Sequence, residues 1–318
     1  MLWTAFNFME DITPMKIRVA IIGCSAVGSI HAAKLAKELG VEVTAVYSRD
    51  AERASSFASR HGIRTSCSSI AEAAREADVA MICSSTAMHF EQARECLRAG
   101  LHTLVELPPC GESSEVEELG ALADKQGVLL GCAHTSRYLL PYTMIQAALD
   151  AGSIGEIQEI SYVRYLQLRA SRTWNDNALL HHAAHAIDLV LRWCGTLDPV
   201  ACIVFPDADS AQTASMLARL PSGKPISITV SYGARLPVAD MVVAGANHTI
   251  ETDGFSILRS DLEGLQCSGN EHAVYEQAIH DQDMQFIRAC RGEDRFIPWA
   301  ETVKLIRVIN QFQSLSKV

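Results

Sequence analysis

KIRVAIIGCSAVGSIHAAKL, residues 16–35, decides the fold of this chain. It opens with an apolar run, Ile17–Ile22, of the kind that a fully buried parallel strand shows. A turn bounded by Gly23 and Gly28 follows, and then a helical pattern over Ile30–Leu39. A strand that feeds a helix through such a turn gathers free backbone N–H groups and the positive helix end at one point. That arrangement predicts an anion site, suited to the pyrophosphate of a dinucleotide.

The turn reads G-x-S-x-x-G, with Ser25 where the dinucleotide fingerprint has its second glycine. Serine is small enough to let a phosphate approach. The alternative is a tight strand-to-helix turn without a ligand. The turn residues that we expect to bind a cofactor are Gly23, Ser25, Ala26, Val27 and Gly28.

Composition restricts the class of protein. The chain has 318 residues, 48% of them hydrophobic, which is long enough for two domains. It has no apolar run of about 18 residues, so we expect no membrane span. The net charge of −10 disfavours nucleic acid as a partner but leaves room for an anionic small molecule beside a local arginine cluster. Ten cysteines without a C-x-x-C pair predict reduced thiols in a cytoplasmic protein, with no structural metal and no disulfide set.

Residues 1–14 contain two acidic residues and no Lys or Arg, so they lack the charge pattern of a signal or transit peptide. We interpret them as an N-terminal extension. The dinucleotide-binding domain is then expected over residues 15–133.

Strands and helices alternate through this domain, which predicts a doubly wound parallel sheet of the Rossmann type. We expect strands at Val41–Tyr47, Val79–Cys83, His102–Glu106 and Val128–Cys132, and helices at Glu52–His61, Ile70–Glu76, His89–Ala99 and Ser114–Gln126. Ligands bind such sheets at the carboxyl ends of the strands. Further cofactor-binding residues are therefore expected at Ser84, Ser85, Thr86, His89, Glu106 and Leu107.

The end of the second strand carries the signal for cofactor type. An acidic residue there accepts hydrogen bonds from the adenosine ribose of NAD, but this chain has Ser48 and then Arg49. A serine and an arginine suit a 2′-phosphate, which favours NADP, with NAD as the alternative. Arg49 can also be an ordinary surface residue.

From Glu156 onward the pattern predicts an α+β domain over residues 134–318 with a mainly antiparallel open sheet. The expected strands are Ile157–Leu168, Ala201–Phe205, Ser215–Leu220, Ile226–Tyr232 and Met241–Ala244, with loops at Pro206–Ser210 and Glu263–Glu271. Helices are expected at Tyr275–Arg291 and Trp299–Leu315, and the second should pack back on the nucleotide domain.

Within this half, Trp174–Cys194 contains three histidines and an aspartate in eight residues. His181, His185 and Asp188 lie at i, i+4 and i+7 and share one helical face, whereas His182 points about 100° away. Three interpretations compete. His185 is a general base that takes a proton from an alcohol; or the group binds a metal; or the histidines are packed without chemistry. The first is favoured, because no second ligand cluster accompanies the motif to bind a metal and three histidines and an aspartate within eight residues are more than packing alone would explain.

The run from Val19 to Ile157 resembles the Gfo/Idh/MocA oxidoreductase family. The resemblance rests on the Gly-rich turn, "CSST", "LVELP", "GCAHTSRYLLP" and "LDAGSIGEI". It implies an NAD(P)-dependent dehydrogenase acting on CH–OH, with His185 as proton acceptor and Asp188 or His181 orienting it. Family members usually carry Glu-Lys-Pro, whereas this chain has Leu107 between Glu106 and Pro108.

Within the family the chain is similar to the 4-carboxy-2-hydroxymuconate-6-semialdehyde dehydrogenases. The shared segments are Glu106-Leu107-Pro108, His134–Tyr138 and the HHAAH of residues 181–185. The resemblance implies a cyclic hemiacetal substrate of aromatic catabolism, oxidised to 2-pyrone-4,6-dicarboxylate. The alternatives are a sugar or polyol dehydrogenase or reductase of the same family and, in another class, a non-catalytic NADP(H)-binding sensor.

A dicarboxylate needs cationic partners, because a guanidinium holds a carboxylate with two parallel hydrogen bonds. The expected substrate-binding residues are Arg137, Arg169, Arg172, His134, His182 and Trp174. By analogy with the family, whose sheets pair between subunits, we expect a homodimer or homotetramer.

Overall fold

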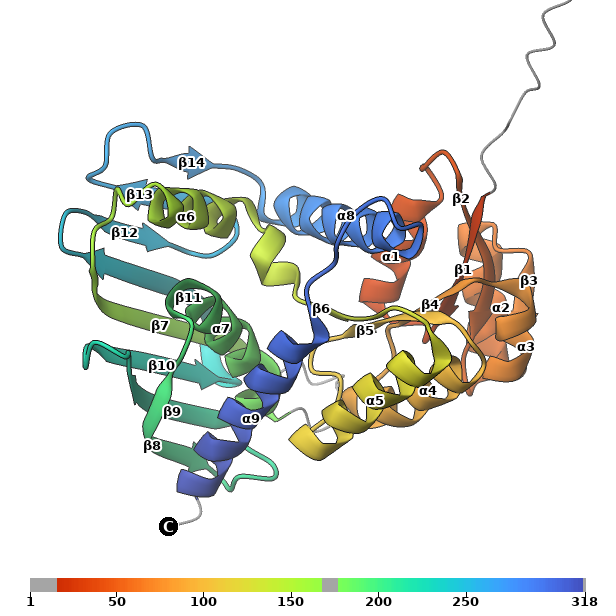
Figure 1. The fold of residues 1–318 in the computed structure, drawn as a ribbon, viewed down its shortest axis with the longest axis horizontal. Coiled ribbons are helices and arrows are strands. Elements are labelled where there is room, and N and C mark those ends of the chain that lie inside the picture. Colours follow the sequence, from red (N-terminus) through yellow and green to blue (C-terminus); the bar gives the residue numbers. More distant parts are fainter. Residues whose placement is uncertain (1–15, 168–176, 317–318) are drawn as a thin grey trace, which may run out of the picture.

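The computed structural model describes residues 16–167 and 177–316 of the chain. The expected fold class is confirmed: a Rossmann-like domain is followed by a domain built on a mostly antiparallel sheet (Figure 1). The strands of the first sheet are β1 (Ile17–Ile22), β2 (Val41–Tyr47), β3 (Thr65–Cys67), β4 (Val79–Ile82), β5 (His102–Glu106) and β6 (Leu130–Ala133). They run parallel in the order β3-β2-β1-β4-β5-β6, so strand order reverses between β1 and β4. A ligand site is expected at that point.

The helices between these strands are α1 (Ala26–Leu35), α2 (Ala51–His61), α3 (Ile70–Glu76), α4 (Thr86–Arg98) and α5 (Ser113–Gln126). α1 begins four residues before its expected start because Ser25 caps it: the Ser25 Oγ accepts a hydrogen bond from Gly28 N at 3.1 Å. It ends at Leu35 rather than at Leu39, and Gly40 then turns the chain in the left-handed region at φ +79°.

The second sheet has eight strands in the order β14-β13-β12-β11-β7-β10-β9-β8. Its strands are β7 (Ile157–Gln167), β8 (Asp198–Phe205), β9 (Thr213–Arg219), β10 (Pro225–Ser231), β11 (Gly233–Gly245), β12 (Thr249–Thr252), β13 (Ile257–Ser260) and β14 (Cys267–Ser268). β7 and β10 pair in parallel and the other neighbours are antiparallel. The short strand β14 lies inside the expected loop 263–271, because two residues of sheet pairing leave no pattern in a sequence.

The remaining helices are α6 (Leu140–Asp150), α7 (Ala178–Cys194), α8 (Glu271–Cys290) and α9 (Trp299–Leu315), with a short 3₁₀ helix, η1, at Thr135–Tyr138. α6 and η1 are absent from the sequence-based expectation. α7 starts at Ala178, where Asn177 Oδ1 accepts a hydrogen bond from Leu180 N at 3.1 Å. None of the helices in the described residues combines the length and apolarity needed to cross a bilayer.

Two C-terminal helices pack against the Rossmann domain, α8 along α1 and α9 against α5 (Figure 1). Trp299 at the start of α9 donates from Nε1 to the carbonyl of Val116 at 2.8 Å. Its ring fits over Gly120, where an added Cβ would lie 2.7 Å from the indole. These contacts place one side of α9 on the nucleotide domain and the other on α7 and β8.

The large sheet has one covered and one open face. α6 and α7 lie on one face (Figure 1), where Ile160 and Ile228 are buried. The other face exposes apolar side chains, among them Ile203 at 75% and Phe205 at 70%. Such a patch is uncommon on a monomer.

Candidate active site

A cavity of about 670 Å³ opens along the carboxyl edge of the Rossmann sheet. Its wall is made of Gly23–Val27, Ser48–Asp50, Arg53, Cys83–Thr86, Met88, His89, Gln92, Glu106, Leu107 and His181. Nearly all the residues expected at the cofactor therefore line one space, and His181 of α7 closes it from the second domain. Gly28 lies behind the wall, where an added Cβ would come 2.9 Å from the carbonyl oxygen of Gly23.

The glycine turn forms a backbone cradle. Gly23 has φ +110°, and a Cβ there would lie 2.6 Å from Ser84 N, so only glycine fits between the ends of β1 and β4. The turn leads directly into the N-terminus of α1. Free N–H groups, the helix dipole and an adjoining cavity suit the pyrophosphate of a dinucleotide, so these residues fit such a cofactor.

Two arginines at the β2 end of the cavity were not singled out by the sequence analysis. Arg53 on α2 donates from Nη2 to the carbonyl of Cys24 at 3.2 Å. A neighbouring cavity of about 410 Å³ is lined by Arg53 and Arg60, which lie four and eleven residues beyond Arg49. The helical spacing from Arg49 is the signal that could have found Arg53.

His89 holds two strand ends together. Its Nδ1 lies 2.8 Å from the carbonyl of Pro108 and its Nε2 lies 3.1 Å from that of Ser84. Burial lowers the pKa of this histidine. Both ring nitrogens are thus engaged by the backbone, so His89 shapes the cavity wall while its polar atoms face the protein. The neighbouring Ser84 Oγ donates to Gln92 Oε1 at 2.6 Å.

Glu106 and Leu107 stand at the far end of the cavity. Glu106 Oε1 lies 3.0 Å from Nε2 of His31, whose Nδ1 lies 2.6 Å from Asp283 Oδ2. Leu107 is 4% exposed and packs in the core. The sequence analysis missed His31 and Asp283; the signal was a histidine three residues after Gly28, on the buried face of α1.

His185 lies one turn after His181 on α7 and is half-buried. Its Nδ1 lies 3.1 Å from the Ser136 Oγ. Burial, followed by the influence of His181, lowers the pKa of His185 to about 4. The ring is therefore neutral at neutral pH and able to accept a proton.

His182, expected at the substrate, packs between two rings. It stacks on His181 with ring centroids 5.0 Å apart, and it meets the ring of Tyr232 edge-on at 5.0 Å. These ring contacts set the position of His181 at the cavity wall.

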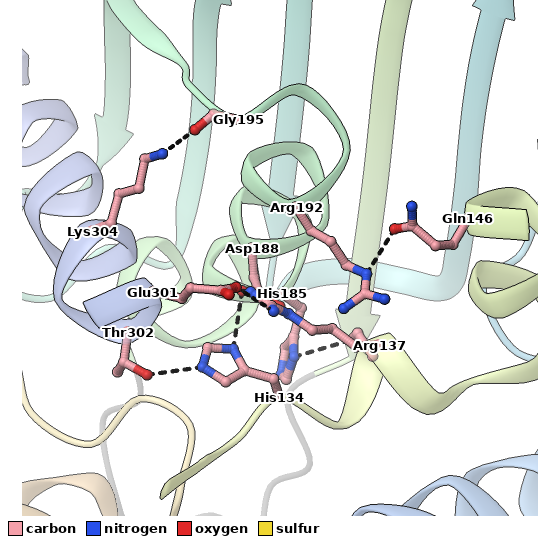
Figure 2. Close-up of polar contacts among 11 residues, drawn as sticks. His134, Arg137, Gln146, His185, Asp188, Arg192, Gly195, Glu301, Thr302 and Lys304 are labelled. Carbon is pink, nitrogen blue, oxygen red and sulfur yellow. Dashed lines mark hydrogen bonds and ion pairs between the residues drawn. The ribbon is translucent and has the colours of Figure 1, made fainter. Parts of the chain in front are cut away.

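Asp188 does not orient His185 as expected. Its carboxylate accepts hydrogen bonds from Arg137 Nε at 2.8 Å and Arg137 Nη2 at 2.6 Å, and it lies 3.0 Å from His134 Nδ1 (Figure 2). Burial alone would raise its pKa, but His134 and Arg137 outweigh burial and hold the pKa below its usual range. Asp188 therefore contacts Arg137 and His134 rather than His185.

Arg137 and His134 were expected to bind substrate, and their contacts speak against that role. Arg137 is buried and also donates from Nη1 to Glu301 Oε2, so two carboxylates already neutralise its charge. His134 is buried between Asp188 and the Thr302 hydroxyl, 2.9 Å from its Nε2. The sequence placed both beside the motif but could not show that α9 supplies their partners.

A different arginine stands in the described part of the substrate domain. Arg164 on β7 is close enough to His185 to help lower its pKa, and its guanidinium lies 4.4 Å from the ring centroid of Phe255. It makes no ion pair within the described residues. The other expected substrate residues, Arg169, Arg172 and Trp174, lie outside the described residues.

A glycine cradle at a Rossmann switch point, with a neutral histidine on a helix of the second domain, fits an NAD(P)-dependent dehydrogenase acting on alcohols or hemiacetals. Residues 17–134 match the model of the Gfo/Idh/MocA oxidoreductase family, described as having an NAD-binding Rossmann fold. The family resemblance seen in the sequence is thereby confirmed.

Relatives extend the match across the chain. A 4-carboxy-2-hydroxymuconate-6-semialdehyde dehydrogenase from Sphingobium sp. strain SYK-6 is 28% identical over 93% of this chain and 98% of its own length. The NADP-dependent scyllo-inositol 2-dehydrogenase IolU of Bacillus subtilis is 33% identical over 47% of this chain and 46% of its own. The WlbA dehydrogenase of Bordetella pertussis, solved with NADH and UDP-GlcNAcA, has the same fold, with a TM-score of 0.83, 17% identity and coverage of 96% and 97%.

Proposed function

We propose that the chain oxidises a cyclic hemiacetal carrying carboxylates, of the 4-carboxy-2-hydroxymuconate-6-semialdehyde type, with NADP as the hydride acceptor and 2-pyrone-4,6-dicarboxylate as the product. The observation that carries the proposal is the pairing of Leu107 with a neutral His185. A hemiacetal hydroxyl is more acidic than an ordinary alcohol, so a base suffices without a neighbouring lysine. The full-length relative from Sphingobium supports this substrate class.

His185 is the proposed proton acceptor. A hydrogen on Nδ1 that donates to Ser136 Oγ leaves the lone pair of Nε2 for the substrate hydroxyl. A bound nicotinamide would supply the chemistry of accepting a hydride from the substrate carbon that bears this hydroxyl. His181, on the cavity wall one turn earlier, faces both the cofactor space and His185.

Arg164 is the proposed partner of a substrate carboxylate in the described part of the chain, because it has no ion pair there and its charge reaches His185. The cations at the opposite end of the cavity, Arg49 and Arg53, support the preference for NADP. A 2′-phosphate would replace the hydroxyl that an acidic residue binds in NAD-specific folds.

The open face of the large sheet supports a homodimer or homotetramer, since Ile203 and Phe205 would otherwise remain in water. A monomer in sedimentation equilibrium would contradict this. The ten unpaired cysteines support a cytoplasmic location, which cell fractionation would test.

The decisive experiment is the reduction of NADP⁺ measured with 4-carboxy-2-hydroxymuconate-6-semialdehyde, scyllo-inositol and a UDP-linked sugar in parallel. We expect turnover with the semialdehyde at a kcat/KM far above that of the others. Turnover with the polyol or sugar alone would replace the proposed substrate class. Binding of NADPH without turnover on any of them would leave only a sensor.

Arg164 offers a matched pair of variants. Arg164→Gln should raise KM for the dicarboxylate by roughly 30- to 100-fold, the loss of one charge-assisted contact, while leaving cofactor affinity unchanged. Arg259→Gln is the control, because Arg259 is an exposed strand arginine of the same sheet with a surface partner, Glu251. Equal effects of the two would remove Arg164 from the site.

A further inference from the structure

His31 lies between two carboxylates, one fully buried and one at the cavity. Its Nδ1 is 2.6 Å from Asp283 Oδ2 on α8, and its Nε2 is 3.0 Å from Glu106 Oε1 at the end of β5. Both ring nitrogens therefore face carboxylate oxygens, and two negative groups, unlike the two backbone carbonyls at His89, favour a hydrogen on each nitrogen, which is the imidazolium form. Burial alone would lower the pKa of His31, but the charge and hydrogen bond of Asp283, together with Cys83, outweigh burial and raise the pKa well above its usual value.

Glu106 connects the buried His31–Asp283 pair to the cavity. Its side chain is 18% exposed and lines the wall, and within the described residues its Oε2 makes no hydrogen bond. Ser48 and Arg49 lie at the opposite end. A dinucleotide that spans the switch point with its adenosine at β2 has its nicotinamide toward β5, on the side of Glu106.

No nearby cation offsets the Glu106 carboxylate from the cavity side. The titratable groups that face His31 or Glu106 are Cys83, His89, Cys132, Tyr275 and Asp283. Burial raises the pKa of both thiols and of Tyr275, to about 12 for the tyrosine, and lowers the pKa of His89, so these four are neutral at neutral pH. Leu107, beside Glu106, brings no charge.

We propose that His31 is a positioning residue that holds Glu106 as a fixed anion at the nicotinamide end of the cavity, so that the chain binds the oxidised cofactor in preference to the reduced one. The inference rests on the proposed function, since it requires a nicotinamide dinucleotide in the cavity. The oxidised ring is a cation and the reduced ring is neutral, so a fixed anion nearby distinguishes them. Asp283 orients the imidazolium as a carboxylate orients a catalytic histidine.

The first test compares dissociation constants of NADP⁺, by calorimetry, and NADPH, by its fluorescence. Glu106→Gln should shift the ratio of the two constants about tenfold toward the reduced cofactor, the equivalent of one partly screened charge. Leu107→Lys, which adds a cation beside Glu106, should shift the ratio in the same direction. Leu107→Met is the matched control and should leave the ratio unchanged, because it keeps size and neutrality.

The second test uses His31→Gln, which retains a donor but removes the charge. Without the imidazolium, no positive charge lies between Asp283 and Glu106, so the two carboxylates repel each other and Glu106 is no longer held in place at the cavity. The preference for the oxidised cofactor should then be weaker than in the wild type. His280→Gln is the control: His280, which lies on α8 like Asp283, has its Nε2 2.8 Å from Glu38 Oε1, in a histidine–carboxylate contact that does not line the cavity.

The outcomes separate the proposed function from the inference about His31 and Glu106. Failure of the wild type to bind either cofactor contradicts the proposed function. Normal binding with an unchanged ratio in Glu106→Gln and Leu107→Lys overturns the present inference alone. An equal ratio of the two dissociation constants in His31→Gln and His280→Gln would show that His31 only packs between helices. If His31→Gln does not fold, the two cavity variants still decide the role of the Glu106 charge.

Discussion

His31 and His185 are both shielded histidines on helices beside the same cavity, yet their neighbours give them opposite charges. His31 lies between Asp283 and Glu106, and its pKa is raised well above the ordinary value. His185 has a hydroxyl at Nδ1 and other histidines nearby, and its pKa falls to about 4. The carboxylate that the sequence places beside His185, Asp188, is instead engaged by Arg137 and His134.

The difference shows that sequence spacing alone does not assign a role to a histidine. A histidine bound on both sides by carboxylates is a fixed cation and suits positioning. A histidine with a single neutral partner keeps a lone pair and suits proton transfer. Variants that remove the partners of His31 or His185 test whether these partners cause the difference in charge between the two histidines.

The largest expected effect is on the rate. His185→Asn should lower kcat by roughly 10²- to 10⁴-fold, because it removes the proton acceptor while retaining a polar group of similar size. The measurement is steady-state NADP⁺ reduction with cofactor affinity determined separately. The surface variant His280→Gln serves as the control. An undiminished kcat in His185→Asn would exclude the histidine from the chemistry.

Stability should respond most strongly at Asp188. Asp188→Asn should cost about 3–5 kcal/mol in the free energy of unfolding, because Arg137 then keeps only the half-exposed Glu301 as a charged partner. Urea denaturation measures the change, and Glu251→Gln, in an exposed pair, should change it by less than about 1 kcal/mol.

The sign of the pH dependence follows from the lowered pKa of Asp188. Stability from its charge is present above the pKa of an unfolded aspartate and is lost as the pH falls below it. The Asp188→Asn variant should therefore lose less of its free energy of unfolding as the pH falls than the wild type does. An acid-unfolding curve identical to that of the wild type would show that other carboxylates dominate.

A smaller effect is expected in the pH profile. The acid limb of kcat/KM should lie near pH 4 rather than near the ordinary histidine value of about 6.5, because His185 stays neutral down to that range. His181→Asn should move the limb to higher pH, since His181 is one of the groups that lower the pKa of His185. A limb that stays in place would mean that burial alone sets the pKa.

His185 also makes the stability of the fold depend on pH, in a direction that its lowered pKa determines. Because the pKa of His185 is lower in the folded than in the unfolded chain, the unfolded chain binds the extra proton between about pH 6.5 and about pH 4. Stability should therefore fall as the pH drops through that window, and His185→Asn should reduce the slope.

The smallest effect is expected at the surface pair. His280→Gln should lower the free energy of unfolding by at most about 1 kcal/mol, because the His280–Glu38 contact is partly exposed to water. Thermal melts of this variant and of His31→Gln, compared directly, show how much burial adds to a histidine–carboxylate contact.

Most of the Rossmann sheet was predictable because its strands are largely apolar runs and helices follow them at a short distance. The edge strand β3, which reads TSC, was missed because three residues of that kind leave no apolar pattern. Ile70–Glu76 and His102–Glu106 match their expected bounds, and the glycine turn lies where its spacing placed it. Parallel βα units depend on neighbours in sequence, so local pattern suffices. The cavity lining follows from the same rule, since strand ends share one edge.

The substrate side was predictable only in outline. His185 and His181 could be selected from their helical spacing, but one of the two carboxylate partners of Arg137, Glu301, comes from α9, 164 residues further along the chain. The pairing of His31 with Asp283 spans 252 residues. Contacts of that separation leave no mark on a single sequence, which is why Arg137 and His134 were assigned to substrate although buried partners already engage them.

Two glycines of the nucleotide domain, Gly120 and Gly131, leave notches that aromatic rings fill, and this matters for engineering chimaeras. Gly131 on β6 would place a Cβ 2.6 Å from Phe296 and 2.8 Å from Phe286, and Gly120 is covered by Trp299 in the same way. The aromatic rings that fill these notches come from the last 50 residues of the chain. A recombinant nucleotide domain that ends near residue 133 would leave the notches unfilled, so a domain graft onto another scaffold has to carry the C-terminal helices with it.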